Sequence, residues 1–330
     1  MYMYMYIVNQ IFSRNSNSFY LLHLFHKLWI EYNSEEGECD MIYRLLALNI
    51  DGTLLYNNGK IAKGLRETIE FVKRKDVYVT LFTSRNFQSA HKVAKALKLD
   101  SILVTHGGAF ISATLDKPYV QRRLSEEKTF NIVQVLEHFD CNVRISHERF
   151  SIGNRERNTP NLIARTVLSS ADPLFYPVQF VDSLGDALRD HPVAAPKIDV
   201  LFQTKGEKER GLNTLRKAFQ HIEYVECDSK RIEILPQNVS KLRGLQLLGE
   251  HLNISLNEMV AIGDSLEDLE VIENVGLGVA MGNAPVEVKQ AADWITRSNS
   301  ENGVEYMIKE HFRKQFPLPF LKNHKNTPKR

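Results

Sequence analysis

Short apolar runs alternate with amphipathic segments along most of the chain after residue 44. Runs at residues 45–50, 77–82 and 102–104 have the length of buried strands. The segments between them, 62–75 and 87–97, carry apolar residues at helical spacing. Strands that alternate with helices are typical of a parallel sheet covered by helices. The pattern therefore predicts two right-handed strand–helix–strand units.

The alternation is less regular in the middle third of the chain. Apolar runs at 198–202 and 222–227 bracket a helical segment at 212–219, which predicts a small α+β domain inserted into the first one. Regular alternation resumes with expected strands at 231–235 and 259–262. We therefore expect an α/β fold, a doubly wound parallel-sheet (Rossmann-like) core with an inserted α+β domain. The expected parts are an N-terminal extension at 1–40, core at 41–121, the insertion at 122–230, core again at 231–315 and a loose tail at 316–330.

The first 40 residues differ from the rest of the chain. Their apolar run at 19–30 is interrupted by His23, His26 and Lys27 and is too short to span a bilayer. We expect Met41 to be the natural start and the preceding segment to be an over-extended reading frame. An amphipathic surface helix is the alternative.

Composition excludes several classes of partner. Lys and Arg total 42 against 40 Asp and Glu, and the formal net charge is +2. Such a balance provides no broad field for nucleic acid or an anionic membrane, so any phosphate specificity must come from a local site. The odd number of cysteines, Cys39, Cys141 and Cys227, fits no metal or redox pattern. We expect reduced thiols in a cytoplasmic protein.

Polar residues follow the apolar runs, at the places where parallel strands end. Ligands of open parallel sheets bind beyond the carboxyl ends of the strands. Hard oxygen ligands suit Mg²⁺, which in turn recruits phosphoryl oxygens, so carboxylates, hydroxyls and an ammonium at this edge predict a magnesium and phosphate site. The candidates are Asn49, Asp51, Gly52, Thr53, Thr83, Ser84, Arg85, Lys241, Gly263, Asp264 and Asp268.

The order of these motifs resembles that of the haloacid dehalogenase (HAD) superfamily, in its Cof-like phosphatase branch. Residues 49–53 read Asn-Ile-Asp-Gly-Thr and resemble the Asp-x-Asp-Gly-Thr signature with its first Asp replaced. Glu267 stands in the fourth motif where Asn is common. The other matching segments are Thr83-Ser84-Arg85, Gly107-Gly108-Ala109, Val239-Ser240-Lys241, residues 263–268 and residues 279–284.

The resemblance implies a role for each candidate. Asp51 would act as general acid and base, Lys241 would offset negative charge, and Thr83 would orient the phosphoryl group. The inserted domain would be the cap that closes over a small phosphorylated metabolite. The implied Mg²⁺ ligands are Asn49, Asp51, Asp264 and Asp268, and the implied phosphate-binding residues are Gly52, Thr53, Ser84 and Asn283.

Simpler interpretations exist for several of these residues. Asp51 could be a turn residue, since Asp-Gly is a common turn pair. We interpret Arg85 as a helix-start or surface residue rather than a phosphate clamp, and His106 as part of a conformational turn, although it could face a substrate. Arg155 and Arg157 are expected on a solvated loop.

Asn49 stands where the resemblance implies a nucleophilic Asp. An amide oxygen is neutral and a poor nucleophile, although it can still ligate Mg²⁺. Two hypotheses follow. The protein is a Mg²⁺-dependent phosphatase with weak activity, or it is a non-catalytic pseudophosphatase that binds Mg²⁺ and a phosphorylated metabolite.

Overall fold

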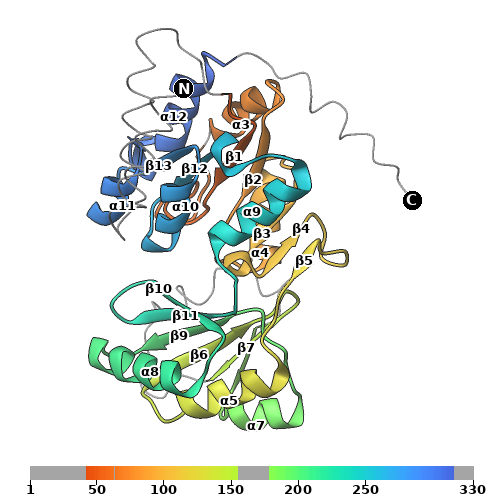
Figure 1. Ribbon diagram of the computed structural model, residues 1–330, viewed down its shortest axis with the longest axis vertical. Helices are drawn as coiled ribbons and strands as arrows, with labels where there is room; N and C mark the ends of the chain where they lie inside the picture. The colour runs from red at the N-terminus through yellow and green to blue at the C-terminus, as the bar shows by residue number, and fades with distance from the viewer. Residues whose placement is uncertain (1–41, 63, 155–177, 316–330) are drawn as a thin grey trace, which may run out of the picture. The chain divides into compact units, whose positions relative to one another are not determined.

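The computed structural model describes residues 42–62, 64–154 and 178–315 of the 330-residue chain. Its first sheet is parallel, and the central strand β1 pairs with β2 on one side and with β12 on the other. In spatial order the strands are β14 (Trp294–Ile295), β13 (Leu277–Ala280), β12 (Met259–Gly263), β1 (Leu45–Leu48) and β2 (Tyr78–Leu81). The predicted parallel sheet is confirmed (Figure 1).

Helices cover both faces of this sheet. Successive strand residues point to opposite sides, so each face contributes its own side chains to an apolar cluster. Leu46 and Leu48 join one apolar cluster, and Leu45 and Ala47 join another. The first cluster includes residues of α3 (Leu65–Lys73), α4 (Phe87–Ala96) and α12 (Gly303–Phe312), and the second includes residues of α9 (Lys241–Leu252) and α10 (Leu269–Asn274). A short helix, α11 (Val286–Ala291), follows β13. The doubly wound core is confirmed.

A second, mainly antiparallel sheet lies between α4 and α9 in the chain. Its six strands are, in spatial order, β10 (Ile222–Glu226), β11 (Arg231–Pro236), β9 (Ile198–Phe202), β6 (Cys141–Ser146), β7 (Ser151–Asn154) and β8 (Val178–Val181). The helices α5 (Glu126–Leu136), α7 (Leu184–Asp190) and α8 (Lys205–Ala218) pack against it (Figure 1). This is the inserted α+β domain that the sequence predicts.

Strand β11 corrects one prediction. We expected residues 231–235 to begin the return to the parallel sheet, but β11 pairs antiparallel with β9 and β10. The reason is its pairing with strands far from it in the sequence: Glu233 lies opposite Asp199 of β9 and Val225 of β10. We propose that the second domain junction lies later, at residues 237–240, between β11 and α9.

A third, three-stranded sheet adjoins the core. It is antiparallel and comprises β3 (Leu103–Thr105), β4 (Phe110–Ser112) and β5 (Val120–Gln121). A parallel bridge between Phe82 and Val104 connects β3 to the end of β2.

Several sequence expectations lie outside the described residues: the extension at 1–40 with Met41 and Cys39, the loop with Arg155 and Arg157, and the tail at 316–330. Of the described cysteines, Cys141 and Cys227 are both free thiols, as expected. Among the described helices, none has the length and apolar character needed to cross a membrane.

The start of α9 packs against the turn at Gly107 and Gly108, whose φ values are +66° and +101°. A Cβ atom on Gly108 would lie 2.1 Å from the carbonyl oxygen of Ser240. Ser240 is the N-cap of α9, and its hydroxyl accepts a hydrogen bond from the backbone N–H of Arg243. This close approach therefore positions Lys241, the first residue of the helix.

We expect Gly108→Ala to destabilise the protein by about 2 kcal/mol or more beyond Gly59→Ala. Both glycines have positive φ, so each alanine carries backbone strain of about 1–2 kcal/mol. A Cβ atom on Gly59 meets nothing within 4 Å, so only Gly108→Ala adds a steric clash. Urea denaturation of both variants measures the difference, and equal losses of unfolding free energy would contradict the close packing of α9.

Candidate active site

The side-chain amide of Asn49 lies among the acidic groups that follow β1 and β12. Its Nδ2 donates to Asp268 Oδ2 at 2.8 Å and to Asp264 Oδ1 at 3.2 Å. Its Oδ1 accepts from the backbone N–H of Ile50 at 2.8 Å. Asn49 is 4% exposed. Its amide nitrogen has hydrogen-bond acceptors as partners, and its amide oxygen has a donor. The surrounding hydrogen bonds therefore fix which end faces the carboxylates.

Asp268 is fully buried and holds the turn after β12 together. Its Oδ2 accepts from the backbone N–H groups of Asp264 and Ser265 at 3.1 and 3.2 Å, and its Oδ1 accepts from Lys241 Nζ at 2.8 Å. Asp264 Oδ1 accepts from the hydroxyl of Thr53 at 2.8 Å. Burial and the neighbouring Asp268 raise the pKa of Asp264 to about 7.

Three oxygens surround the Asn49 amide nitrogen. Besides the carboxylates of Asp264 and Asp268, the backbone carbonyl of Asp51 lies 3.4 Å from Nδ2. Carboxylate and carbonyl oxygens are the ligands that Mg²⁺ takes, so these residues fit the metal that the family resemblance implies. For Asn49 to offer its oxygen as well, the amide must turn over, which points its NH₂ group at the N–H of Ile50. As it lies, the Asn49 amide offers a metal ion neither a negative charge nor its oxygen.

A buried ammonium group, that of Lys241, lies beside the carboxylates. Lys241 is 6% exposed and is 3.2 Å from Glu267 Oε2 as well as bonded to Asp268. Burial alone would lower the pKa of Lys241, but Asp268 and Glu267 raise it well above its usual value. Burial would raise the pKa of Glu267, but Lys241 and the hydroxyl of Ser84 lower it to about 2. The ammonium is therefore charged at neutral pH.

Arg85 is a residue whose place the sequence interpretation missed. It lies at a helix start as expected, directly before Asn86, the N-cap of α4, but it is not a surface residue, since its side chain is only 15% exposed. Its Nε donates to Asp51 Oδ2 at 2.6 Å, and Nη2 donates to the other carboxylate oxygen. Such a two-pronged contact orients a carboxylate. The signal available in the sequence was the position of Arg85 at the carboxyl end of β2.

The remaining predicted residues lie around this centre. Thr83 is buried, and its hydroxyl accepts from the N–H of Arg85 at 3.1 Å. Gly52 has φ +66°, and a Cβ atom there would lie 1.9 Å from Asp264 Oδ2, so only glycine fits. Asn283 Nδ2 donates to the Gly52 carbonyl at 2.9 Å. Asn283 thus connects its own loop to the loop after β1.

His106 does not face the solvent. It is fully buried, and no hydrogen-bond partner of its Nε2 was found among the described residues. Burial and the nearby Lys197 lower the pKa of His106 to about 3, so the imidazole is neutral. This placement favours the conformational interpretation of the turn.

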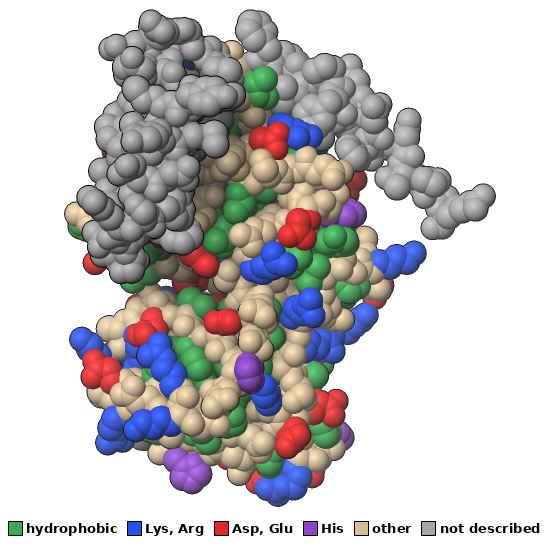
Figure 2. Space-filling view, viewed as in Figure 1, with side chains coloured by type: hydrophobic (Ala, Val, Ile, Leu, Met, Phe, Trp, Pro, Cys, Tyr) green, Lys and Arg blue, Asp and Glu red, His purple; other side chains and the backbone are tan. Residues whose placement is uncertain are grey.

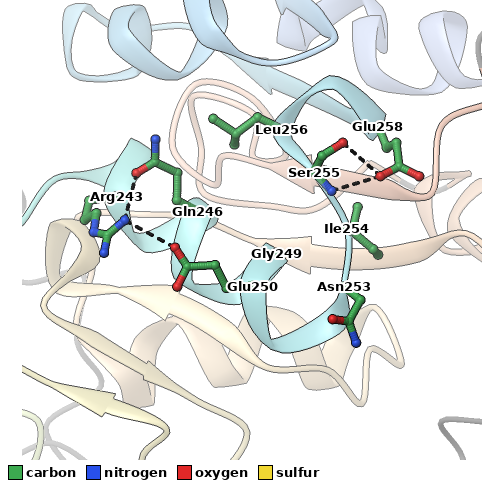
Figure 3. A pocket seen from close by; sticks show the side chains of 9 residues that line it. All are labelled: Arg243, Gln246, Gly249, Glu250, Asn253, Ile254, Ser255, Leu256 and Glu258. Carbon is green, nitrogen blue, oxygen red and sulfur yellow. Dashed lines mark hydrogen bonds and ion pairs between the residues drawn. The ribbon is translucent and has the colours of Figure 1, made fainter.

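A surface hollow along α9 contains none of the predicted site residues. It is lined by α9 and the loop after it, and Arg243 points toward Gln246 and Glu250 (Figure 3). It belongs to the outer face of the helix that begins with Lys241.

The sequence profile of haloacid dehalogenase-like hydrolases matches residues 46–308, from β1 to α12. The match includes every predicted site residue. The chain belongs to the haloacid dehalogenase-like hydrolase family. This assignment confirms the family that the sequence motifs resemble.

Relatives within this hydrolase family cover nearly the whole of the described region. The chain is 49% identical to the stress response protein YhaX of Bacillus subtilis over 281 residues, which are 85% of this chain and 97% of YhaX. It is 30% identical to the 5-amino-6-(5-phospho-D-ribitylamino)uracil phosphatase YcsE of the same organism, over 82% of this chain and 96% of YcsE. A haloacid dehalogenase-like hydrolase structure from B. subtilis has a TM-score of 0.70 at 24% identity, and the match covers 81% of this chain and 99% of that chain.

We expect Asn49→Asp to bind Mg²⁺ at least about tenfold more tightly than the wild type, a gain of about 1.4 kcal/mol. The new carboxylate adds a charge and a ligand oxygen that needs no reorientation. Calorimetric titration measures the affinity, and Asn274→Asp, an exposed substitution on α10, controls for charge alone. Equal affinities of the wild type and Asn49→Asp would refute this description of the amide.

Asp264→Asn should raise the melting temperature of the metal-free protein at pH 8. Because the folded-state pKa of Asp264 is raised to about 7, its contribution to stability is present below about pH 4 and is lost as the pH rises through 7. The gain should therefore shrink toward pH 5.

The same substitution should weaken Mg²⁺ binding. Thermal melts in EDTA and calorimetry check both, and unchanged Mg²⁺ affinity would remove Asp264 from the metal site.

Proposed function

We propose that this protein binds Mg²⁺ and a small phosphorylated metabolite, and that it is a phosphatase whose turnover is impaired by Asn49. The observation that carries the proposal is the convergence of Asp51, Lys241, Asp264 and Asp268 at the carboxyl end of the parallel sheet. Its relative YcsE is a phosphatase of a phosphorylated ribitylamino-uracil, which supports the same class of substrate.

The proposed roles follow from the positions of the side chains. Lys241 and Ser84 would bind phosphoryl oxygens and offset their charge. In the wild type, water would attack phosphorus directly; Asp51 would give its proton to the leaving oxygen as the P–O bond breaks and would take up a proton from the attacking water. For this it must exchange its contact with Arg85 for one with the substrate.

The metal would be held by Asp264, Asp268 and the Asp51 carbonyl. When bound, Mg²⁺ supplies positive charge that neutralises phosphoryl oxygens and holds them in one orientation. The inserted domain, as a cap, would carry the residues that choose the metabolite.

A second candidate function is non-catalytic binding of Mg²⁺ and a phosphorylated metabolite. The orientation of Asn49 favours it, because Oδ1 is bonded to the Ile50 N–H and Nδ2 faces two carboxylates. An amide oxygen in that position is a poor nucleophile toward phosphorus. The two candidates share the ligand and differ in turnover.

The surface supports a small-molecule partner in a cytoplasmic setting. On the face visible in Figure 2, basic and acidic side chains are interspersed over the described part. Such mixing, with a net charge of +2, favours neither nucleic acid nor an anionic membrane as partner. The free thiols of Cys141 and Cys227 agree with a reducing compartment.

A panel of phosphorylated metabolites tests the proposal on the wild type and Asn49→Asp in parallel, with Mg²⁺. Restoring the carboxylate should raise turnover about 100-fold or more, because a nucleophile is recovered. Adding Asp51→Asn should abolish that gain. Ordinary phosphatase rates in the wild type would refute the impairment, and binding without turnover in the wild type would favour the second candidate.

A further inference from the structure

Glu267 points its carboxylate into the anion-binding side of the site. It lies in the short 3₁₀ turn Leu266–Asp268, directly before the buried Asp268. Its Oε2 accepts from the Ser84 hydroxyl at 2.7 Å and lies 3.2 Å from Lys241 Nζ. The thiol of Cys227, from the inserted domain, also contacts this carboxylate.

These donors coincide with those that a phosphoryl group requires. An ammonium and a hydroxyl are typical partners of phosphoryl oxygens, and a carboxylate is an anion that accepts from the same partners. Lys241 and Ser84 are also the residues to which we assign phosphate binding. In the structure both are already engaged by an anion of the chain itself.

The carboxylates around Ser84 disfavour a second anion at this place. Glu233 Oε2 lies 3.0 Å from the same Ser84 hydroxyl, which has one hydrogen to donate to two carboxylates. Lys197 is bonded to Glu233 Oε1 at 2.6 Å and to Asp199. A phosphate dianion placed next to the Ser84 hydroxyl would be repelled at short range by the carboxylates of Glu233 and Glu267.

A bound metal is a less economical explanation of the cluster. Ligand atoms of Cys227, Glu233 and Glu267 lie within 4.8 Å of one another and could in principle hold an ion. However, Lys197 and Lys241 already supply positive charge to the two carboxylates. The contacts of Glu267 are those of a paired anion.

We propose that Glu267 is a specificity-determining residue, whose carboxylate takes the place of a phosphoryl group between Ser84 and Lys241 and so opposes the binding of phosphorylated ligands that do not displace it. The proposal rests on the function proposed above for Ser84 and Lys241. A phosphorylated ligand enters only by displacing the carboxylate from both donors.

Binding of inorganic phosphate to the full-length protein with Mg²⁺, measured by calorimetry, tests the proposal. Glu267→Gln keeps the shape of the side chain and removes its charge, so phosphate should bind at least about tenfold more tightly than in the wild type. Glu270→Gln, an exposed substitution three residues away, should leave the affinity within about twofold. Glu267→Asn serves as a second neutral variant, and thermal melts show that each variant is folded.

Lys241→Met separates this proposal from the proposed function. In the Glu267→Gln background it should abolish phosphate binding, because the ammonium group to which we assign phosphate binding is lost. If both neutral variants bind phosphate no more tightly than the wild type while binding still depends on Lys241, Glu267 has no selective role and the proposed function stands. If phosphate binds to no variant, both proposals are overturned.

Discussion

The ion pair between Lys241 and Asp268 is the interaction on which the site depends. Nζ and Oδ1 are 2.8 Å apart, and the two side chains are 6% and 0% exposed. Removing one partner of such a pair typically costs about 3–5 kcal/mol, because the other charge stays buried and uncompensated. Asp268 also binds the backbone of Asp264 and Ser265. The pair therefore joins the start of α9 to the turn that carries Asp264 and Asp268, to which we assign the metal.

Asn49 is a neutral donor within this set of charges. Its NH₂ group satisfies oxygens of Asp264 and Asp268 that would otherwise repel each other or require a cation. The amide thus lies between the two carboxylates and donates to both. The same substitution removes the charged oxygen that would attack phosphorus. In our proposal, the pairing of the two carboxylates and the impaired nucleophilic chemistry are therefore two consequences of one residue.

The sequence was sufficient for the elements with strong local patterns. The apolar runs of β1 and β12 and the motifs after them predicted where Asp51 and Asp264 meet, because parallel strands end at one edge. Features that depend on distant partners were not predictable from local patterns. The membership of β11 in the second sheet depends on pairing with β9 and β10. The Arg85–Asp51 contact joins residues 34 positions apart, and the Ser84–Glu267 contact joins residues 183 positions apart.

The central claim is that Asn49 cannot act as a nucleophile in this environment. Intact-protein mass spectrometry after rapid acid quenching, with a phosphorylated metabolite and Mg²⁺ present, tests it most directly. We predict a covalent phosphoryl adduct on residue 49 in Asn49→Asp and none in the wild type. A phosphoryl adduct on Asn49 of the wild-type protein would contradict the account.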